Sequence, residues 1–173
     1  MDRGAVRPSS IPFCIAILVA AAFCTNIVLS NNLKNKVEDS LVVNVTDYPF
    51  NFTMTLEKAE YALGEHVKVK LRLTYIGDEN ITTLLNSPPM FDFDVYDAQG
   101  RHIYKWTNKR GFICLAINLT WSPGKYIEET LSWEQTIHDY EGEQAPPGVY
   151  YITGRTYIIE LQTPPIYIRL EDS

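Results

Sequence analysis

The sequence has only three cysteines in 173 residues, and this scarcity excludes two common ways of stabilising a small domain. Cys14 and Cys24 lie in an apolar N-terminal stretch, so Cys114 is the only cysteine in the rest of the chain. A single thiol cannot form an internal disulfide, and a structural zinc site needs a cluster of ligands. We therefore expect Cys114, inside the apolar run 112–117, to pack as a small hydrophobic residue.

Positive charge is also scarce. The chain has 15 Lys and Arg residues against 21 Asp and Glu residues, which gives a formal net charge of −6, and its basic residues form no dense cluster. An acidic surface repels the phosphate backbone of DNA and RNA. We therefore expect no nucleic-acid partner.

The common catalytic motifs are missing as well. The sequence contains no G-x-S-x-G, H-E-x-x-H, G-x-x-x-x-G-K-[ST] or G-x-G-x-x-G pattern. Of the three histidines, His66 falls on the polar side of an alternating segment, whereas His102 and His138 lie in or beside predicted turns. No serine has an activating sequence context. We expect no catalytic residues, no cofactor and no enzymatic activity, so the chain should act by binding.

Three carboxylates, Asp92, Asp94 and Asp97, come close together in one alternating segment. Asp92 and Asp94 would project from the same strand face, about 7 Å apart. With Asp97 or the acidic turn 139–143 they could supply oxygen ligands to Ca²⁺. Acidic residues are also common on a solvated sheet face, where they oppose edge pairing. We favour the solvated face and expect no metal site.

Residues 1–30 have the organisation of an export signal. Arg3 and Arg7 precede an apolar stretch from Ile11 to Leu29, which is the order of the charged and apolar regions of a signal peptide or signal anchor. The whole stretch is just long enough for one membrane-spanning helix, with the arginines in the cytoplasm. We expect a single-pass protein of the cell membrane with its folded domain outside. The alternative is cleavage near residues 20–22, which would give a secreted protein.

Four N-x-[ST] sequons support a location of the folded domain outside the cytoplasm. Chance would give roughly one in a chain of this composition. Attached glycans need exposed positions in an exported protein. The candidate glycosylation sites are Asn44, Asn51, Asn80 and Asn118.

Beyond the N-terminal segment, the pattern of apolar and polar residues is that of short β-strands. Residues 31–44 lack a sustained apolar period and are predicted to be a linker, and residues 45–173 to form one domain. Apolar and polar residues alternate in that domain, most clearly from Val67 to Tyr75, and turn residues separate eight or nine such runs, including one over 112–121. This pattern predicts an all-β, antiparallel sandwich in which each sheet has one wet and one dry face, preceded by one N-terminal apolar helix.

The stretch from Leu56 to Gly154 resembles the BsuPI family, which is named for an intracellular proteinase inhibitor of bacteria. The similarity depends on the order and spacing of turn residues and core aromatics. They are Phe93-x-Val95-x-Asp97-x-x-Gly100, Trp106, Phe112, Leu119, Pro123-Gly124, Trp133, Gly142, Pro147-Gly148-x-Tyr150 and Gly154. The resemblance implies an immunoglobulin-like sandwich and a serine protease as the protein partner.

The resemblance assigns no inhibitory loop, so the candidate binding loop comes from the residues themselves. Pro146, Pro147 and Gly148 form a stiff turn whose fixed backbone would lose little entropy on binding; the alternative is a turn that only connects two strands. We expect an extracytoplasmic protein-binding module that acts as a proteinase inhibitor. The alternative function is a structural or accessory domain of the cell envelope with no protease target.

Overall fold

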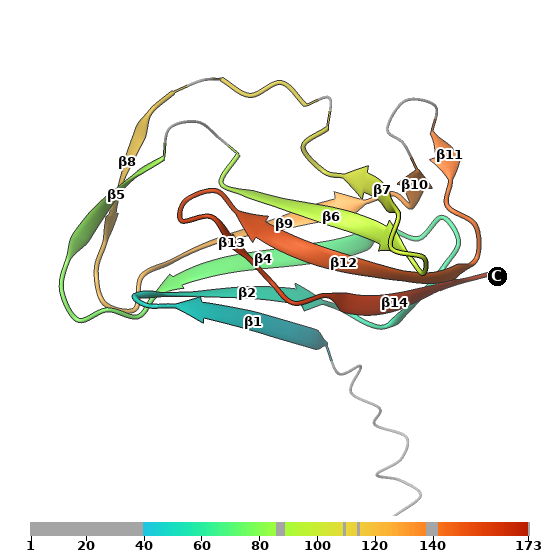
Figure 1. The fold of residues 1–173 in the computed structure, drawn as a ribbon, viewed down its shortest axis with the longest axis horizontal. Helices are drawn as coiled ribbons and strands as arrows, with labels where there is room; N and C mark the ends of the chain where they lie inside the picture. The colour runs from blue at the N-terminus through green and yellow to red at the C-terminus, as the bar shows by residue number, and fades with distance from the viewer. Residues whose placement is uncertain (1–39, 86–88, 109, 114, 138–141, 173) are drawn as a thin grey trace, which may run out of the picture. The chain divides into compact units, whose positions relative to one another are not determined.

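The computed structural model describes residues 40–85, 89–108, 110–113, 115–137 and 142–172, and the regular elements among them are all β-strands (Figure 1). The chain divides into two compact units, Met1–Val37 and Glu38–Ser173, of which the first lies outside the described residues. The second unit consists of two main sheets that face each other across one core, together with two short ribbons. The predicted all-β sandwich is confirmed.

The first main sheet has four strands, all antiparallel to their neighbours. In spatial order they are β1 (Leu41–Asp47), β2 (Phe50–Leu56), β4 (Val67–Tyr75) and β9 (Tyr126–Trp133). Residues 41–44, which the sequence placed in the linker, form the first half of β1 and pair with the end of β2. The reason is that Leu41 and Val43 continue the inward row of β1 and pack against the core.

The second main sheet is larger and contains one departure from the predicted antiparallel arrangement. In spatial order its strands are β3 (Glu60–Ala62), β14 (Ile166–Glu171), β12 (Gly148–Thr156), β6 (Phe91–Asp97) and β7 (His102–Lys105), with β13 (Leu161–Gln162) paired to the end of β12. The short edge strand β3 runs parallel to β14. It leaves the end of β2 in the first sheet and joins the second sheet at its edge, where its direction matches that of β14.

Two ribbons of two strands each extend from the sandwich (Figure 1). They are β5 (Ile81–Leu85) with β8 (Ile117–Trp121), and β10 (Thr136–Ile137) with β11 (Glu143–Gln144). The strands of each ribbon directly precede or follow strands of the main sheets in the sequence. The ribbons therefore lie at the periphery of the domain.

The alternation that predicted the strands also fills the core. In β4, every second residue from Val67 to Tyr75 is buried and the residues between them reach the surface, as predicted. The two sheets approach each other closely at Gly154 of β12, where a Cβ atom would lie 2.5 Å from Cδ2 of Leu71 and 3.3 Å from Sδ of Met54. A side chain at this position would therefore collide with the opposite sheet.

The part of the chain that the structure describes contains no helix with the length and apolar character of a membrane span. The predicted N-terminal helix falls in residues 1–30, outside that part.

Candidate functional site

The predicted binding loop lies at the end of the sandwich where β12 begins. Pro146 and Pro147 are exposed and Gly148 is half-buried. The hydroxyl of Tyr150 donates a hydrogen bond to the carbonyl oxygen of Pro146 at 2.7 Å. Because this bond and the start of β12 hold both sides of the turn, the loop is fixed as well as exposed. It lines a depression of about 260 Å³ with the neighbouring turn 97–101 and Ile137.

Asp97 closes that neighbouring turn. Its Oδ1 accepts hydrogen bonds from the backbone amides of Gln99 (3.0 Å) and Arg101 (2.9 Å), and its Oδ2 accepts one from Nε of Arg101 at 2.6 Å. Burial alone would raise the pKa of the Asp97 carboxyl, but the hydrogen bonds from Arg101 and Gln99 hold it below its ordinary value. Asp97 is therefore a structural residue of the turn, with its oxygens already committed to protein donors.

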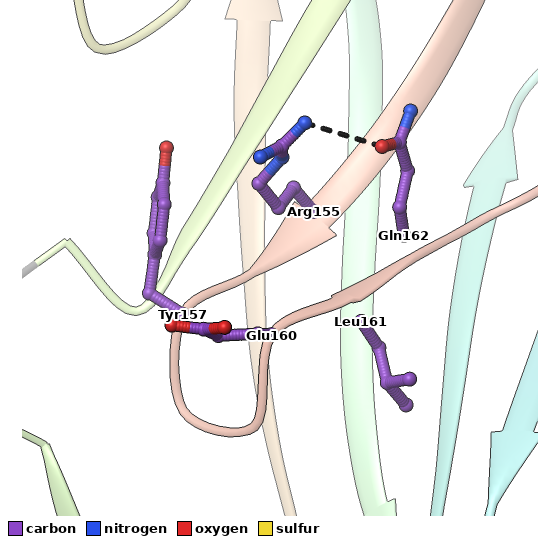
Figure 2. Close-up of a pocket in the computed structure, with 5 residues that line it drawn as sticks. All are labelled: Arg155, Tyr157, Glu160, Leu161 and Gln162. Atoms are coloured by element: carbon purple, nitrogen blue, oxygen red, sulfur yellow. Dashed lines mark hydrogen bonds between the residues drawn. The ribbon is translucent and has the colours of Figure 1, made fainter.

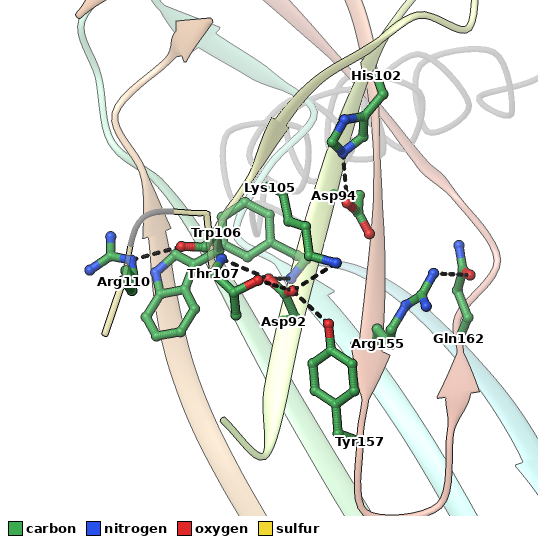
Figure 3. Close-up of polar contacts among 11 residues, drawn as sticks. Asp92, Asp94, His102, Lys105, Trp106, Thr107, Arg110, Arg155, Tyr157 and Gln162 are labelled. Carbon is green, nitrogen blue, oxygen red and sulfur yellow. Dashed lines mark hydrogen bonds and ion pairs between the residues drawn. The ribbon is translucent and has the colours of Figure 1, made fainter. Parts of the chain in front are cut away.

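Asp92 and Asp94 are buried, which corrects the prediction of a solvated sheet face. Asp92 has no exposed surface and Asp94 is 5% exposed, although both lie on the outer face of β6. Side chains from β7 and from the segment after β12 cover them (Figure 3). Oδ1 of Asp94 lies 2.7 Å from Nε2 of His102. No group of three metal-ligating side chains occurs among the described residues.

Asp92 is the centre of a hydrogen-bond network that fixes the chain after β7 (Figure 3). It accepts hydrogen bonds from the backbone amide of Thr107 at 3.1 Å, from Oγ1 of Thr107 at 2.6 Å and from the hydroxyl of Tyr157 at 3.0 Å. It also accepts one from the amide of Phe93 at 2.9 Å, and Nζ of Lys105 lies 3.4 Å from its Oδ2. A buried charge with this many partners stabilises the geometry around it.

The charges in this network reinforce one another. Burial alone would lower the pKa of the Lys105 ammonium, but hydrogen bonding with Tyr157 and the charges of Asp92 and Asp94 raise it above its ordinary value. Burial raises the pKa of the Tyr157 hydroxyl. Lys105 therefore stays protonated beside its acidic neighbours, and Tyr157 stays a hydrogen-bond donor.

The network continues into the β7–β8 connection, residues 106–116, of which 109 and 114 lie outside the described residues. Nε of Arg110 donates to the carbonyl oxygen of Trp106 at 2.7 Å, and its guanidinium lies 4.4 Å from the centre of the Trp106 ring. The ring of Phe112 contacts Trp106 with their centroids 6.2 Å apart. The first half of the connection is thus held against the second main sheet.

The second half of the connection contradicts the strand predicted over 112–121. Regular structure begins only at Ile117, and the side chains of Ile113 and Leu115 are 82% and 60% exposed. The apolar run 112–117 implied burial, but it has no neighbouring strand before β5 pairs with β8. In Figure 1 the described residues of this second half lie away from both sheets. Cys114, predicted to pack as a small buried or half-buried hydrophobic residue, lies outside the described residues.

Gln135 is a buried polar residue that sequence reasoning did not identify. Its side chain accepts a hydrogen bond from the amide of Gly64 at 2.9 Å and donates to the carbonyl oxygens of Ala62 (2.9 Å) and Glu65 (2.7 Å). Its backbone has a positive φ of 55°. Gln135 therefore joins the turn before β4 to the connection after β9, and a single glutamine outside any motif gives no sequence signal for this role.

A small surface pocket lies next to the Asp92 network, at the turn between β12 and β13 (Figure 2). It has a volume of about 280 Å³ and is lined by Arg155, Tyr157, Glu160, Leu161 and Gln162. Nη2 of Arg155 donates to Oε1 of Gln162 at 3.1 Å, whereas Nε of Arg155 is buried with no hydrogen-bond partner among the described residues.

Two of the three histidines lie in the described part of the chain. His66 is exposed, as predicted, and its Nδ1 lies 3.3 Å from Oγ of Ser132 on the outer face of the first sheet. No carboxylate ion pair with His66 occurs among the described residues. His138 lies outside the described residues. The Ser132–His66 contact is thus an exposed surface pair without the orienting acid of a catalytic triad.

Three of the four predicted glycosylation sites are exposed: Asn44, Asn80 and Asn118. Asn51 is half-buried, and the nitrogen and the oxygen of its side-chain amide both form hydrogen bonds. Its Nδ2 donates to Oγ1 of Thr46 at 3.0 Å, and its Oδ1 accepts from Oγ1 of Thr53 at 3.1 Å. An attached glycan at Asn51 would have to replace the first of these bonds.

The fold and its loops define a class of protein in which a rigid β-sandwich carries exposed connecting segments suited to binding. The chain belongs to the BsuPI family, described as intracellular proteinase inhibitors, whose model matches residues 54–158. This family is named for inhibition of proteinases and not for an enzymatic activity. No curated protein matches the chain.

Several solved structures are similar to part of this chain. They include a β-glucosidase from Listeria innocua (15% identity over 70% of this chain, TM-score 0.43) and a β-glucosidase from Erythrobacter marinus (16% identity over 76%, TM-score 0.44). This chain spans 16% of the length of either enzyme. The CARDB domain of the PF1109 protein from Pyrococcus furiosus shows 10% identity, with 79% of this chain and 97% of that domain covered and a TM-score of 0.38. Similarity at this level supports no statement about function.

Proposed function

We propose that this chain is a proteinase inhibitor, with a serine protease as its target, and that it binds the protease through connections carried by the sandwich. The observation that carries this proposal is the family match over residues 54–158, which includes strands of both main sheets. The anchored turns support it, because preorganised loops lose little entropy when they enter a preformed cleft. The proposal includes an immunoglobulin-like arrangement of the strands.

The test is inhibition of a panel of serine proteases by the purified full-length chain. The panel should include subtilisin-like, chymotrypsin-like and elastase-like enzymes, because their primary pockets differ in size. We expect micromolar or tighter inhibition of at least one enzyme, with the chain recovered intact. If none is inhibited while the chain stays intact, the inhibitor function is refuted, and a structural or accessory role in the cell envelope becomes the better hypothesis.

We also propose that the domain lies outside the cytoplasm, tethered or exported by residues 1–30. The support is the order of charged and apolar residues in that segment and the exposure of Asn44, Asn80 and Asn118. The family description names intracellular inhibitors, so this location would distinguish the chain from the protein for which its family is named. Mass spectrometry of the native protein tests the proposal: an unmodified chain recovered from the cytoplasmic fraction would refute it.

A further inference from the structure

We infer that the β7–β8 connection is the segment that enters the active-site cleft of the target protease, with Ile113 and Leu115 as its apolar contacts. This inference rests on the proposed inhibitor function and assigns the loop that performs it. The favoured target is a serine protease whose primary pocket accepts a bulky apolar side chain.

The first support is the exposure of large apolar side chains. Ile113, at 82%, is the most exposed large hydrophobic residue among those that the structure describes, and Leu115 reaches 60%. Two such residues in one connection cost free energy in water unless a partner covers them. Apolar side chains that fill a partner's pocket commonly provide most of the binding energy of an interface.

The second support is the backbone of the same segment. Gly111, Phe112, Ile113, Leu115 and Ala116 form no backbone hydrogen bond with another described residue. None of these five residues has a positive φ. Within the described part of the chain these groups have no backbone partner, and the inference assigns them an extended strand of the protease, in the way that peptides add to exposed sheet edges.

The third support is the anchored base of the connection. Buried Asp92 fixes Thr107 through two hydrogen bonds, and the guanidinium of Arg110 packs on Trp106 (Figure 3). Phe112 contacts the same indole ring. The chain immediately before Ile113 is thus held by the body of the domain, and a fixed base reduces the entropy lost when the exposed part is bound.

The alternative loop at Pro146, Pro147 and Gly148 is less suited to a protease cleft. Both prolines lack an amide hydrogen, and Gly148 and Val149 already pair with β14. That loop therefore offers few backbone donors to a cleft that binds substrates as extended strands. Its stiffness is explained by its position at the start of β12.

The test compares two doubly substituted full-length chains with the wild type against whichever protease of the panel the wild type inhibits. One carries Ile113→Asp with Leu115→Asp, and the matched control carries Pro147→Asp with Val149→Asp, which adds the same charge to the other loop. We expect the first pair to weaken inhibition at least about 100-fold, since it removes two apolar anchors, and the control to change it less than about 3-fold. Thermal unfolding confirms that both variants are folded, and Ile113→Ser with Leu115→Ser replaces the first pair if it does not fold.

The outcomes separate the inference from the function on which it rests. Equal inhibition by the wild type and the Ile113/Leu115 variant refutes the loop assignment and leaves the inhibitor function standing. Loss of inhibition in the Pro147/Val149 variant alone assigns the contact to that loop instead. A wild-type chain that inhibits no protease refutes the function and the inference together.

Discussion

Replacement of Asp92 by Ala should destabilise the domain more than any other single loss of a hydrogen-bonding side chain in the second sheet. Asp92 has no exposed surface and accepts hydrogen bonds from Phe93, Thr107 and Tyr157. Its removal leaves buried donors without acceptors and Lys105 without its nearest described acid. Breaking a buried, charged network of this kind costs about 3–5 kcal/mol.

This cost corresponds to a large change in melting temperature. For a unit spanning Glu38–Ser173, the entropy of unfolding is about 0.3 kcal/mol per kelvin, so Asp92→Ala should lower the melting temperature by about 10–17 °C. The assay is thermal unfolding of the full-length chain followed by far-UV circular dichroism. The amides of residues 106–108 should also exchange faster with solvent, because Thr107 loses both of its bonds to the carboxylate.

Asp92→Asn is the matched control. It keeps the shape of the side chain and one acceptor oxygen, and the hydroxyls of Thr107 and Tyr157 can rotate, so the loss should be only about 1–2 kcal/mol. An Asp92→Ala variant that melts within about 3 °C of the wild type, or an Asp92→Asn variant that loses more stability than Asp92→Ala, would contradict this prediction. Either result would mean that the network does not hold the start of the β7–β8 connection.

Three further predictions follow from single positions in the two sheets and their connections. Gly154→Ala should lower stability by about 1–3 kcal/mol in urea unfolding, because the added Cβ meets Leu71 of the opposite sheet at 2.5 Å; an unchanged midpoint would show that the sheets can separate. Gln135→Ala should cost about 1–3 kcal/mol in the same measurement, since it removes the partner of two carbonyl oxygens and one amide in the turn before β4, and a loss below about 0.5 kcal/mol would contradict the role assigned to it. Glu129 lies on the inward row of edge strand β9, and burial raises the pKa of its carboxyl above the ordinary value of 4.5. The protonated Glu129 therefore contributes stability below pH 4.5, and this contribution is lost as the pH rises through the raised pKa. Glu129→Gln should therefore raise the melting temperature at neutral pH and have little effect below pH 4.5. A larger gain at acidic pH would contradict the raised pKa of Glu129.

The long core strands were predictable because they depend on a local pattern, whereas the first half of β1 was assigned to the linker. The alternation from Val67 to Tyr75 specifies one buried face whatever its neighbours are, and the structure keeps that face. The strand face predicted for Asp92 was also correct, since its side chain lies on the outer face of β6. Its burial was not predictable, because the groups that cover it come from Thr107 and Tyr157, which are 15 and 65 residues away in the sequence.

The same limit explains the main error in the candidate site. The apolar run 112–117 has the composition of a buried strand, but burial also requires a neighbour to pair with, and β8 finds one only from Ile117 onward. Ile113 and Leu115 are therefore left exposed. The stiffness of the Pro146–Gly148 turn was predictable from proline geometry, whereas the pairing of its following residues with β14 depends on the tertiary arrangement.

Amide hydrogen exchange of the full-length chain, with and without the inhibited enzyme, shows whether the β7–β8 connection contacts the protease. We expect slowed exchange at residues 111–116 in the complex and unchanged exchange at residues 144–149. Protection confined to residues 144–149, with 111–116 exchanging as in the free chain, would contradict this expectation.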